Sequence, residues 1–400
     1  MVDINLCKIG IGEFGPIQGG TQGNLIDIPK CTCFVGPQGS GKSTVAKLIS
    51  EFSWLEKALV RGEVSEKDLV KKNRFQNKYC QYHRLSSYFR RETWIAYEGE
   101  YYHFQYAHGA FSVSRRDVEV FDLPKVLYIP AERILVSVTD KTGIIKFLPD
   151  ALRSFYEEYD NARSNIKAEL SLPVDDIVFT YDRLNRIGWI RGDKFRTRLS
   201  ESASGFQSLA PLFLASWHLS ELVMSDMNKT EMEQAVYEKM EREVRAIMTN
   251  SDLTEEVRNA ALKSLSSRFR YSHFVNVVEE PELNLYPVSQ ERLLRDLVKL
   301  ANTHERNRLI CTTHSPYILS ALNNLMYAAQ VGAKRPKEVE KIIPSIYWIQ
   351  PEKVAAYTTE GGCIQSIIDT EINQIEAERI DNISSELNTK YEQLLDLDVE

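Results

Sequence analysis

A glycine-rich run near the N-terminus has the residue types and the spacing of a phosphate-binding loop. It matches G-x-x-x-x-G-K-[ST] in full and lies between a short apolar run and a stretch with helical periodicity. Its glycines allow backbone N–H groups to face phosphate oxygens, and the start of a helix adds positive potential. Lys42 can reach the β- and γ-phosphates of a nucleotide, and the Ser43 hydroxyl suits Mg²⁺. The predicted nucleotide-contacting residues are Gly36, Pro37, Gln38, Gly39, Ser40, Gly41, Lys42, Ser43 and Thr44.

Two adjacent carboxylates, Glu279 and Glu280, follow the apolar run Phe274–Val278. A pair of acids at the end of a buried strand is the partner that a phosphate-binding loop needs for hydrolysis. We assign Glu279 to Mg²⁺, directly or through water, and Glu280 to the orientation and deprotonation of an attacking water. The alternative is a charged loop after a core strand, and the phosphate-binding loop argues against it.

His314 and Ser204 are candidate sensors of phosphate. His314 follows the apolar run Leu309–Cys311, and a histidine at a strand tip beside a phosphate site can sense the γ-phosphate, although a lone histidine is more often an ordinary polar residue. Ser204 and Gly205 stand at the start of a predicted helix, where a hydroxyl and free N–H groups form an anion site. By themselves these two residues indicate an ordinary helix N-cap, and only the other motifs favour the anion site.

Taken together, these four motifs resemble those of the ABC-class ATPases. The segment A-S-G-F-Q (Ala203–Gln207) aligns with the family signature L-S-G-G-Q, with Phe206 in place of one glycine. E-E-P stands where the family has D-E-P, and His314 stands at its switch histidine. The longer run E-E-P-E-L-N-L-Y-P, followed by T-H-S-P, is similar to the branch of overcoming-lysogenisation (OLD), RecF-like and SMC-like ATPases. Within that branch it is most similar to the prokaryotic AAA family ATPases often found in phage-defence loci.

The resemblance covers about residues 1–350 and implies an ABC-type ATPase head that uses ATP and Mg²⁺. It implies a head-to-tail homodimer, or a higher homo-oligomer, in which Ser204 and Gly205 of one head complete the site around Lys42 of the other. It also implies a separate effector protein, a nuclease or a toxin, that the ATPase controls in antiviral defence. The residue of the family's glutamine loop stays open among Gln76, Gln81 and Gln105.

Two other functions fit the same motifs. One is an ATP-bound scaffold or sensor with little turnover, and the other is a RecF-like clamp in DNA repair. The chain shows no acidic nuclease pattern of the TOPRIM type, so an OLD-type nuclease would have to be a separate polypeptide. The intact Glu280 favours hydrolysis over the scaffold.

The periodicity of apolar residues predicts the elements that must position these residues. Strands alternating with helices imply an α/β fold, an ABC-type ATPase head with a mixed, largely parallel sheet core. An antiparallel β segment is expected at about 94–129, helical insertions at about 56–91 and 224–269, and a separate C-terminal segment at 351–400. The individual elements expected are strands Cys31–Val35, Trp94–Val113, Leu127–Ile129, Phe274–Val278 and Leu309–Thr312, a hairpin Ile177–Ile190, and helices Ser43–Leu55, Leu152–Leu170, Phe206–Met227, Glu231–Leu265 and Glu291–Asn302.

Length and composition exclude several classes of protein. The 400 residues are 43% hydrophobic and 26% charged, which is enough for a sizeable core. The net charge of −7 argues against a chain that binds nucleic acid over its whole surface. The six cysteines are scattered and predict reduced thiols rather than a disulfide framework, and no apolar run approaches the ~20 residues of a membrane span. We therefore expect a cytoplasmic protein.

Charge is distributed unevenly along the chain. Residues 369–400 hold ten acids and two bases, a net of −8. Their apolar residues predict a docked amphipathic helix or, alternatively, a site for a basic partner. The apolar positions are Ile372, Ile375, Ile380, Ile383, Leu387, Tyr391, Leu394 and Leu395. Residues 71–91 hold no acid and interleave basic with aromatic side chains, which fits a partly buried helix with a solvated basic face or, alternatively, nucleic-acid binding. The basic residues are Lys71, Lys72, Arg74, Lys78, Arg84, Arg90 and Arg91.

Overall fold

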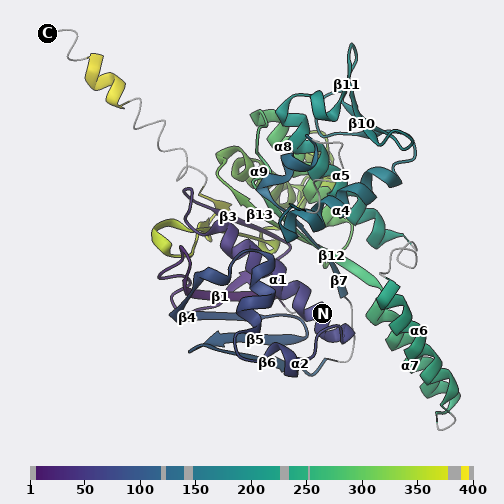
Figure 1. The fold of residues 1–400 in the computed structure, drawn as a ribbon. Coiled ribbons are helices and arrows are strands. Elements are labelled where there is room, and N and C mark those ends of the chain that lie inside the picture. Colours follow the sequence, from purple (N-terminus) through teal and green to yellow (C-terminus); the bar gives the residue numbers. More distant parts are fainter. Residues whose placement is uncertain are drawn as a thin grey trace.

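A six-stranded sheet forms the centre of the computed structural model, which describes residues 6–118, 123–138, 147–225, 234–250, 253–376 and 389–395 (Figure 1). The strand order is β15-β14-β3-β13-β12-β7, and all neighbours are parallel except β15 and β14. The predicted α/β fold class is confirmed. The strands are β3 (Cys31–Val35), β7 (Leu123–Ile129), β12 (Tyr271–Glu279), β13 (Arg308–Thr313), β14 (Val354–Thr358) and β15 (Gln365–Ser366).

The central strands are buried on both faces, which explains why they read as continuous apolar runs in the sequence. Side chains alternate between the faces, so Cys33 and Val35 enter one core while Phe34 enters the other. In β12, Val278 enters the same core as Cys33, and Val277 enters the same core as Phe34. Each predicted acid or histidine follows such a strand, and parallel pairing brings those strand ends to one edge of the sheet.

An antiparallel sheet in the order β2-β1-β4-β5-β6 shares the core that contains Phe34 and Val277 with helix α1 and one face of the central sheet. The elements are β1 (Cys7–Phe14), β2 (Ile26–Ile28), α1 (Lys42–Arg61), β4 (Phe89–Glu98), β5 (Tyr102–Ala107) and β6 (Ala110–Arg115). The predicted antiparallel segment at 94–129 is therefore too long. Its last strand, β7, pairs in parallel with β12 because its alternating apolar residues complete the central sheet.

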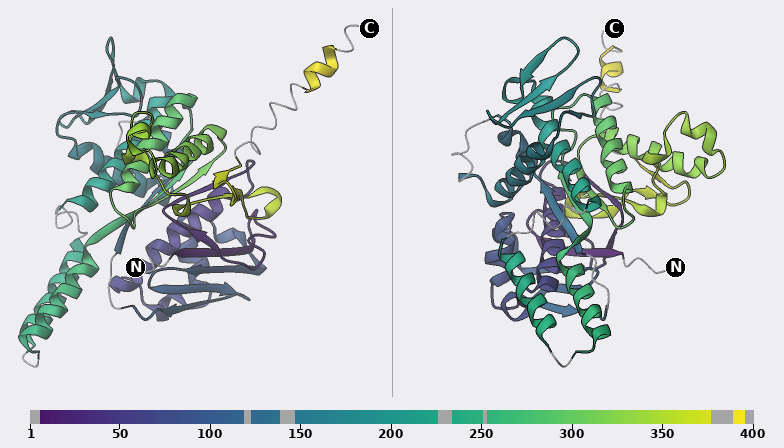
Figure 2. Two further views of the ribbon diagram at one scale, coloured as in Figure 1. Left: turned by 180° about the vertical axis from the view of Figure 1, so that it is seen from behind. Right: turned by 90° about the vertical axis from the view of Figure 1, so that its right-hand side faces the viewer.

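Helices cover the other face of the central sheet (Figure 2). They are α4 (Asp150–Asn165), α5 (Ser204–Met224), α8 (Pro287–Asn302) and α9 (Pro316–Gly332), followed by the short α10 (Pro336–Glu340). A small antiparallel sheet joins this lobe and contains the predicted hairpin as β9 and β10. Its strands are β8 (Leu170–Ser171), β9 (Val178–Asp182), β10 (Ile187–Arg191) and β11 (Arg196–Arg198).

The predicted insertion at 224–269 contains a pair of helices that projects from the start of β12 (Figure 1, Figure 2). Helices α6 (Gln234–Thr249) and α7 (Glu255–Phe269) lie side by side, with Leu265 packed against Met240, Val244 and Ile247. We had expected one long helix over most of this range. Thr254 caps the start of α7 by accepting a hydrogen bond from the Val257 N–H, which fixes the start of the second helix.

The predicted insertion at 56–91 is not one helix. Helix α1 ends at Arg61, where Gly62 adopts the left-handed conformation that commonly terminates helices. Four short helical turns follow, and they pack over α1. They are α2 (Glu66–Leu69), the π-helical turn η1 (Phe75–Tyr79), α3 (Cys80–Tyr82) and the 3₁₀ turn η2 (Ser86–Tyr88).

The central sheet continues past residue 350, where we had placed the end of the head, because β14 pairs with β3. Two further strands, β16 (Ile368–Asp369) and β17 (Gln374–Ile375), pair with each other. Ile372 and Ile375 were expected in the acidic helix but lie in the turn and in β17. Residues 389–395 are helical and exposed, so this part of the tail is not docked, and the predicted apolar positions Ile380, Ile383 and Leu387 lie outside the described residues.

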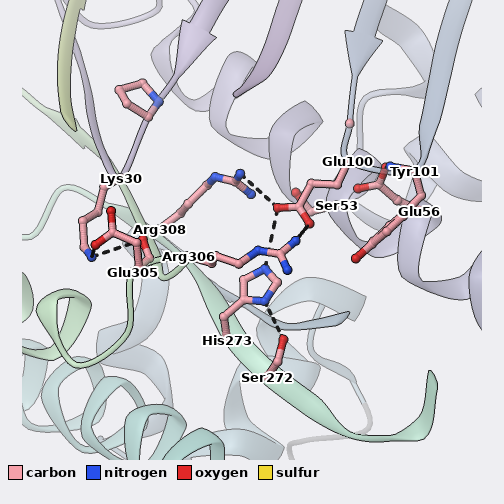
Figure 3. Close-up of polar contacts among 12 residues, drawn as sticks. Lys30, Ser53, Glu56, Glu100, Tyr101, Ser272, His273, Glu305, Arg306 and Arg308 are labelled. Carbon is pink, nitrogen blue, oxygen red and sulfur yellow. Dashed lines mark hydrogen bonds and ion pairs between the residues drawn. The ribbon is translucent and has the colours of Figure 1, made fainter. Parts of the chain in front are cut away.

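A buried ionic cluster joins the antiparallel sheet to the central one (Figure 3). Glu100, in the turn after β4, lies between the guanidinium groups of Arg306 and Arg308, and the Arg308 Nη2 is 3.1 Å from its Oε1. His273 Nε2 is 4.0 Å from the same oxygen, and Ser272 contacts the other ring nitrogen. Burial lowers the pKa of His273, so the two arginines alone neutralise Glu100.

Glu56 fixes α1 against the same turn. Its Oε1 accepts hydrogen bonds from the Tyr101 and Tyr102 N–H groups at 2.7 and 3.0 Å. Burial, reinforced by the charge of Glu100, raises the pKa of Glu56 to about 7. A Cβ at Gly99 would lie 2.2 Å from this oxygen, so the turn requires glycine for the close approach. The helix that follows the phosphate-binding loop is thus held at its C-terminal half.

None of the described helices has both the length and the apolar composition that a membrane crossing requires. All six cysteines are free, five of them buried, as the sequence predicts.

Candidate functional site

The phosphate-binding loop connects the end of β3 to the first residue of α1. Gly36, Gly39 and Gly41 have φ values of 148°, 72° and 107°, a region that favours glycine. A Cβ at Gly41 would also lie 2.6 Å from the Ile17 side chain. The glycines of the motif are therefore needed for the shape of the loop. That shape places the N-terminus of α1 directly after the loop, so the first N–H groups of the helix face it.

Lys42 closes this loop with its side chain. Its ammonium donates hydrogen bonds to the carbonyl oxygens of Gly36 and Pro37, both at 2.8 Å. Burial lowers the pKa of Lys42, and the carboxylates of Glu280, Glu282 and Glu279 oppose that shift. The cation therefore lies over the loop, where phosphate oxygens of a nucleotide would meet it.

Thr359, directly after β14, braces the loop from the side. Its Oγ1 is 2.6 Å from the Ser40 Oγ, and its N–H donates to the Val35 carbonyl oxygen at 2.9 Å. Sequence reasoning missed Thr359 because 319 residues separate it from Ser40. The only available signal was the short apolar strand before it, which places a residue at the same edge of the sheet.

The two predicted acids have different surroundings. Glu279 is the last residue of β12 and is buried; its Oε2 accepts a hydrogen bond from the Ala131 N–H at 3.3 Å, while Lys47 Nζ is 3.9 Å from its Oε1. Glu280 has a φ of 44° and is anchored by its N–H to the Thr312 carbonyl oxygen at 2.9 Å. This backbone turn brings the Glu280 carboxylate to the cavity beside Lys42, where a water could reach it.

The residues assigned to Mg²⁺ fit a hard cation in their donor chemistry. The buried Glu279 Oε1 has no hydrogen-bond partner, and a buried carboxylate oxygen without a donor suits a cation ligand. The Ser43 hydroxyl lines the cavity. No group of three or more histidine, cysteine or acidic side chains with metal-binding geometry occurs in the described part of the chain. A metal here would thus take most of its ligands from phosphate and water, as Mg²⁺ usually does.

A fully buried arginine holds the acid pair. Arg133 donates through Nη1 to the Glu279 carbonyl oxygen and through Nη2 to that of Glu280, both at 2.6 Å. Its Nε donates to the Ser208 carbonyl oxygen in the first turn of α5 at 3.2 Å, and Nη1 also approaches Pro130. Burial lowers the pKa of Arg133 to about 10. One side chain therefore ties the acids to the helix that carries the predicted signature.

His314 lies between the acids and the phosphate-binding loop. Its Nε2 is 3.6 Å from the Glu280 Oε1, and its N–H donates to the Glu282 Oε1 at 2.6 Å. Burial, with the nearby charge of Lys42, lowers the pKa of His314, which favours the neutral ring. Burial also raises the pKa of Glu282. Glu282 was part of the quoted motif without a role, and here it fixes the backbone of the histidine.

A cavity of about 430 Å³ lies over the phosphate-binding loop. Glu280 and His314 line it, as do residues from the antiparallel-sheet side that sequence reasoning did not connect with the nucleotide. Arg90 is held there by a hydrogen bond to the Gly15 carbonyl oxygen at 2.6 Å. The lining residues are Gly15, Pro16, Gln38, Gly39, Gly41, Lys42, Ser43, Thr44, Ser87, Tyr88, Arg90, Glu280 and His314.

Ser204 and Gly205 are not part of this cavity. Ser204 is the first residue of α5 and is exposed, and a Cβ at Gly205 would lie 2.9 Å from the Asn284 carbonyl oxygen. Gln207 holds the preceding turn through hydrogen bonds from its Nε2 to the Ser200 and Ser202 carbonyl oxygens, both at 3.0 Å. The structure therefore leaves the predicted signature facing outward, apart from the loop of its own chain.

The basic segment 71–91 is partly neutralised and its aromatic residues are partly buried. Lys71 and Arg74 pair with Asp68 at 2.9 and 3.1 Å, and Phe75 and Tyr79 are in the core. These two rings cannot stack on nucleic-acid bases. Arg90 belongs to the cavity described above.

None of the three glutamine-loop candidates lines the cavity. Gln76 and Gln81 both contact Ser86, and Gln105 is exposed on β5. The edge of the sheet between the acids and α5 is instead occupied by the segment after β7, which includes Ala131 and Arg133.

Comparison with known proteins gives one family match. The family model described as an AAA ATPase domain matches residues 257–319, a range that includes both acids and His314. No curated protein matches the chain. The match and the complete phosphate-binding loop support an ATP-binding ATPase domain.

Three solved structures are similar at low identity. The SMC head domain from Thermotoga maritima is 12% identical, with a TM-score of 0.39, over 91% of this chain and 98% of that one. An Smc head domain derived from Pyrococcus furiosus, with an extended coiled coil and bound to the C-terminal domain of ScpA, is 10% identical, with a TM-score of 0.38, over 96% and 99%. UvrA2 from Deinococcus radiodurans is 13% identical, with a TM-score of 0.26, over 79% and 34%. At TM-scores below 0.5 this likeness does not assign a function.

Proposed function

We propose that this protein hydrolyses ATP as a head-to-tail dimer whose opening and closing control a separate effector. The observation that carries the proposal is the separation of two predicted phosphate-binding elements. The loop around Lys42 opens on a cavity with Glu280 and His314, whereas Ser204 is exposed outside that cavity. A second head could supply what the first lacks.

In this proposal the residues of the cavity divide the chemistry. Glu280 accepts the proton of the attacking water, and His314 braces the γ-phosphate. Lys42 leaves the loop carbonyls for the β- and γ-phosphates. Ser43 and Glu279 would hold Mg²⁺, which when bound neutralises the charge that develops on the phosphates. Tyr88 and Arg90, which line the same cavity, would flank the nucleoside.

The start of α5 is suited to read the nucleotide of a partner head. Its first N–H groups lack partners within the helix, and they carry positive potential that favours an anion. Ser204 adds an exposed hydroxyl. Two-fold symmetry would then make two equivalent composite sites, each with the loop of one head and the helix start of the other.

The effector and the setting rest on the motif resemblance alone. We propose a nuclease or toxin in antiviral defence, with the protein acting in the cytoplasm. The scaffold with little turnover is less well supported because Glu280 is anchored at the cavity. The RecF-like clamp is less well supported because Phe75 and Tyr79 of the basic segment are buried.

Mixing two inactive variants tests the composite site. Ser204→Arg places a bulky cation at the helix start, and Lys42→Ala removes the phosphate-binding ammonium, so each alone should lose hydrolysis. Random pairing makes half of the dimers mixed, each with one intact composite site of two. Turnover should therefore return to about a quarter of the wild-type value if the sites act independently.

The matched control mixes Ser204→Arg with the double variant Lys42→Ala/Ser204→Arg, which has no intact partner helix and should restore nothing. Phosphate release is the measurement, and calorimetry should show ATP binding to Ser204→Arg. Wild-type turnover by Ser204→Arg alone would contradict the dimer model.

A further inference from the structure

A second cavity of about 310 Å³ lies along the middle of α1, away from the phosphate-binding loop. Helix α1, the turns η1 and α3, strand β7 and helix α4 each contribute to its wall. None of the residues assigned above to nucleotide or Mg²⁺ lines it. The lining residues are Ser50, Glu51, Trp54, Lys78, Tyr79, Tyr82, His83, Val126, Tyr128 and Ser154.

Several polar atoms in this wall lack partners. The Tyr79 hydroxyl and the His83 Nδ1 are buried without a hydrogen bond among the described residues, and their residues are at most 4% exposed. Nearly all buried polar side-chain atoms in folded proteins have a partner. Two such atoms in the wall of one cavity indicate that something else, a ligand or water, completes their hydrogen bonds.

Glu51 is the single acidic side chain in the wall, and it is 4% exposed. Among the described residues Glu51 makes no ion pair with a lysine or arginine. The ionisable group beside it is His83, whose Nε2 is 4.0 Å from the Glu51 Oε2. Burial, with the nearby charge of Lys47, lowers the pKa of His83 to about 3, so the ring is neutral and cannot balance a carboxylate. Burial raises the pKa of Glu51 to about 8. A carboxyl with this pKa is largely protonated at neutral pH, and a cation that binds beside it would displace its proton and supply the counter-charge that a buried carboxylate requires.

Aromatic rings line the same cavity as Glu51. Trp54, Tyr79 and Tyr82 line the cavity, and the faces of such rings attract cations, alkylammonium and guanidinium groups in particular. Lys78 illustrates the contact, because its Nζ lies 5.0 Å from the centre of the Tyr79 ring. Lys78 itself is exposed at the rim and makes no ion pair with Glu51.

We propose that this cavity binds a small organic cation, a primary ammonium or guanidinium compound, with Glu51 as its counter-charge and the aromatic rings around its apolar part. The hydroxyls of Tyr79 and Tyr128 and the neutral His83 would accept its N–H groups. The ligand would contact α1 on one side and α4 on the other, so it would join the nucleotide-binding side of the head to the lobe that carries α5.

Calorimetry with defined probes tests this site. The probes are n-butylammonium chloride and n-butylguanidinium chloride, with 1-butanol as the neutral analogue of the same size and adenine as a neutral ring, all at constant ionic strength. Both cations should bind saturably, one per chain, and 1-butanol should bind about ten- to a hundredfold more weakly because it lacks the charge-assisted contact. Equal binding of 1-butanol, binding of adenine without the cations, or no saturable binding of either cation would overturn the proposal.

Two variants and a control locate the binding. Glu51→Gln keeps the size of the side chain and should weaken cation binding by the same factor, while Glu63→Gln, an exposed acid beyond the end of α1, should leave it unchanged. Trp54→Leu keeps the acid and should weaken binding about five- to thirtyfold, which provides a second test if Glu51→Gln does not fold. Unchanged affinity in either cavity variant would overturn the site.

Discussion

Helix α1 borders two cavities, and they differ in the charge they can accept. At its N-terminus, free N–H groups, three glycines and Lys42 make a cavity for an anion. Along its middle, where the helix uses its N–H groups internally, the wall offers Glu51 and aromatic rings and suits a cation. In the first cavity the backbone N–H groups contribute to the preference for an anion. In the second cavity only side chains can set the preference for a cation.

The two cavities also differ in how their polar groups are satisfied. Lys42 donates to two loop carbonyls, and Ser40 contacts Thr359, so the first cavity is held in shape by internal hydrogen bonds. In the second, the Tyr79 hydroxyl and the His83 Nδ1 have no hydrogen-bond partner among the described residues, and the Glu51 carboxyl lies 4.0 Å from the His83 Nε2. The polar groups of the first cavity therefore fix its shape, whereas the burial of Glu51 in the second destabilises the fold.

The largest expected effect is the loss of hydrolysis at the first cavity with no change in binding at the second. Glu280→Gln keeps the size of the side chain but removes the base, so ATP hydrolysis should fall about 10²- to 10⁴-fold while ATP still binds. Steady-state phosphate release and nucleotide calorimetry are the measurements. Binding of n-butylammonium at the second cavity should not change.

Glu132→Gln is the matched control for this variant, because Glu132 is exposed and does not line the nucleotide cavity. Hydrolysis by Glu280→Gln at the wild-type rate would assign the base elsewhere.

The next effect tests the cost of the second cavity. In the unfolded chain Glu51 ionises near its ordinary pKa of 4.5, and in the folded chain near 8. Between these values the folded state binds the extra proton, so the carboxyl destabilises the fold increasingly as pH rises from 4.5 to 8. Glu51→Gln removes this dependence, and its advantage over the wild type should grow to a few kcal/mol by pH 8.

Urea unfolding of both proteins between pH 5 and 9 measures this difference. Contributions of other titrating groups cancel in the comparison, and His83 stays neutral throughout. A stability difference that is constant with pH would show that Glu51 is not destabilised by burial.

The smallest effect concerns the brace of the first cavity. Thr359→Val keeps the shape of the side chain but removes the contact with Ser40, at a cost of about 1 kcal/mol. ATP should then bind about fivefold more weakly in calorimetry, with hydrolysis at saturating ATP little changed. Thr358→Val is the matched control, because it makes the same exchange one residue earlier, where the hydroxyl has no described hydrogen bond. Equal ATP affinity in all three proteins would remove Thr359 from the site.

The predictable part of the site is local in the sequence. One loop and one helix start form the whole phosphate cradle, so the motif around Lys42 could be read directly. Glu279, Glu280 and His314 could be placed because parallel strands bring their carboxyl ends to one edge, and β3, β13 and β12 are adjacent.

The unpredicted part depends on packing between distant segments. Thr359 reaches the loop only because β14 pairs with β3, and Glu51 is buried only because the turns after α1 fold back over it. From the sequence alone, an acidic residue in a predicted helix is expected to be solvent-exposed, because the segments that pack over it are not known. In the tail the sequence pattern predicts the wrong element. Ile372 and Ile375 fit a helical period, but the chain there forms a turn and a short strand.

The acceptors of Arg133 have a consequence for how the sequence can vary. Every described hydrogen bond of its guanidinium ends on a backbone carbonyl, those of Pro130, Ser208, Glu279 and Glu280. Backbone oxygens are present whatever the side chain, so each of those four positions can be exchanged without removing an acceptor. Residue 133 has no such freedom, because lysine lacks the planar fork that reaches several carbonyls at once. In a set of related sequences, the arginine should therefore persist where Pro130 and Ser208 vary, while Glu279 and Glu280 are kept by the roles proposed for their side chains.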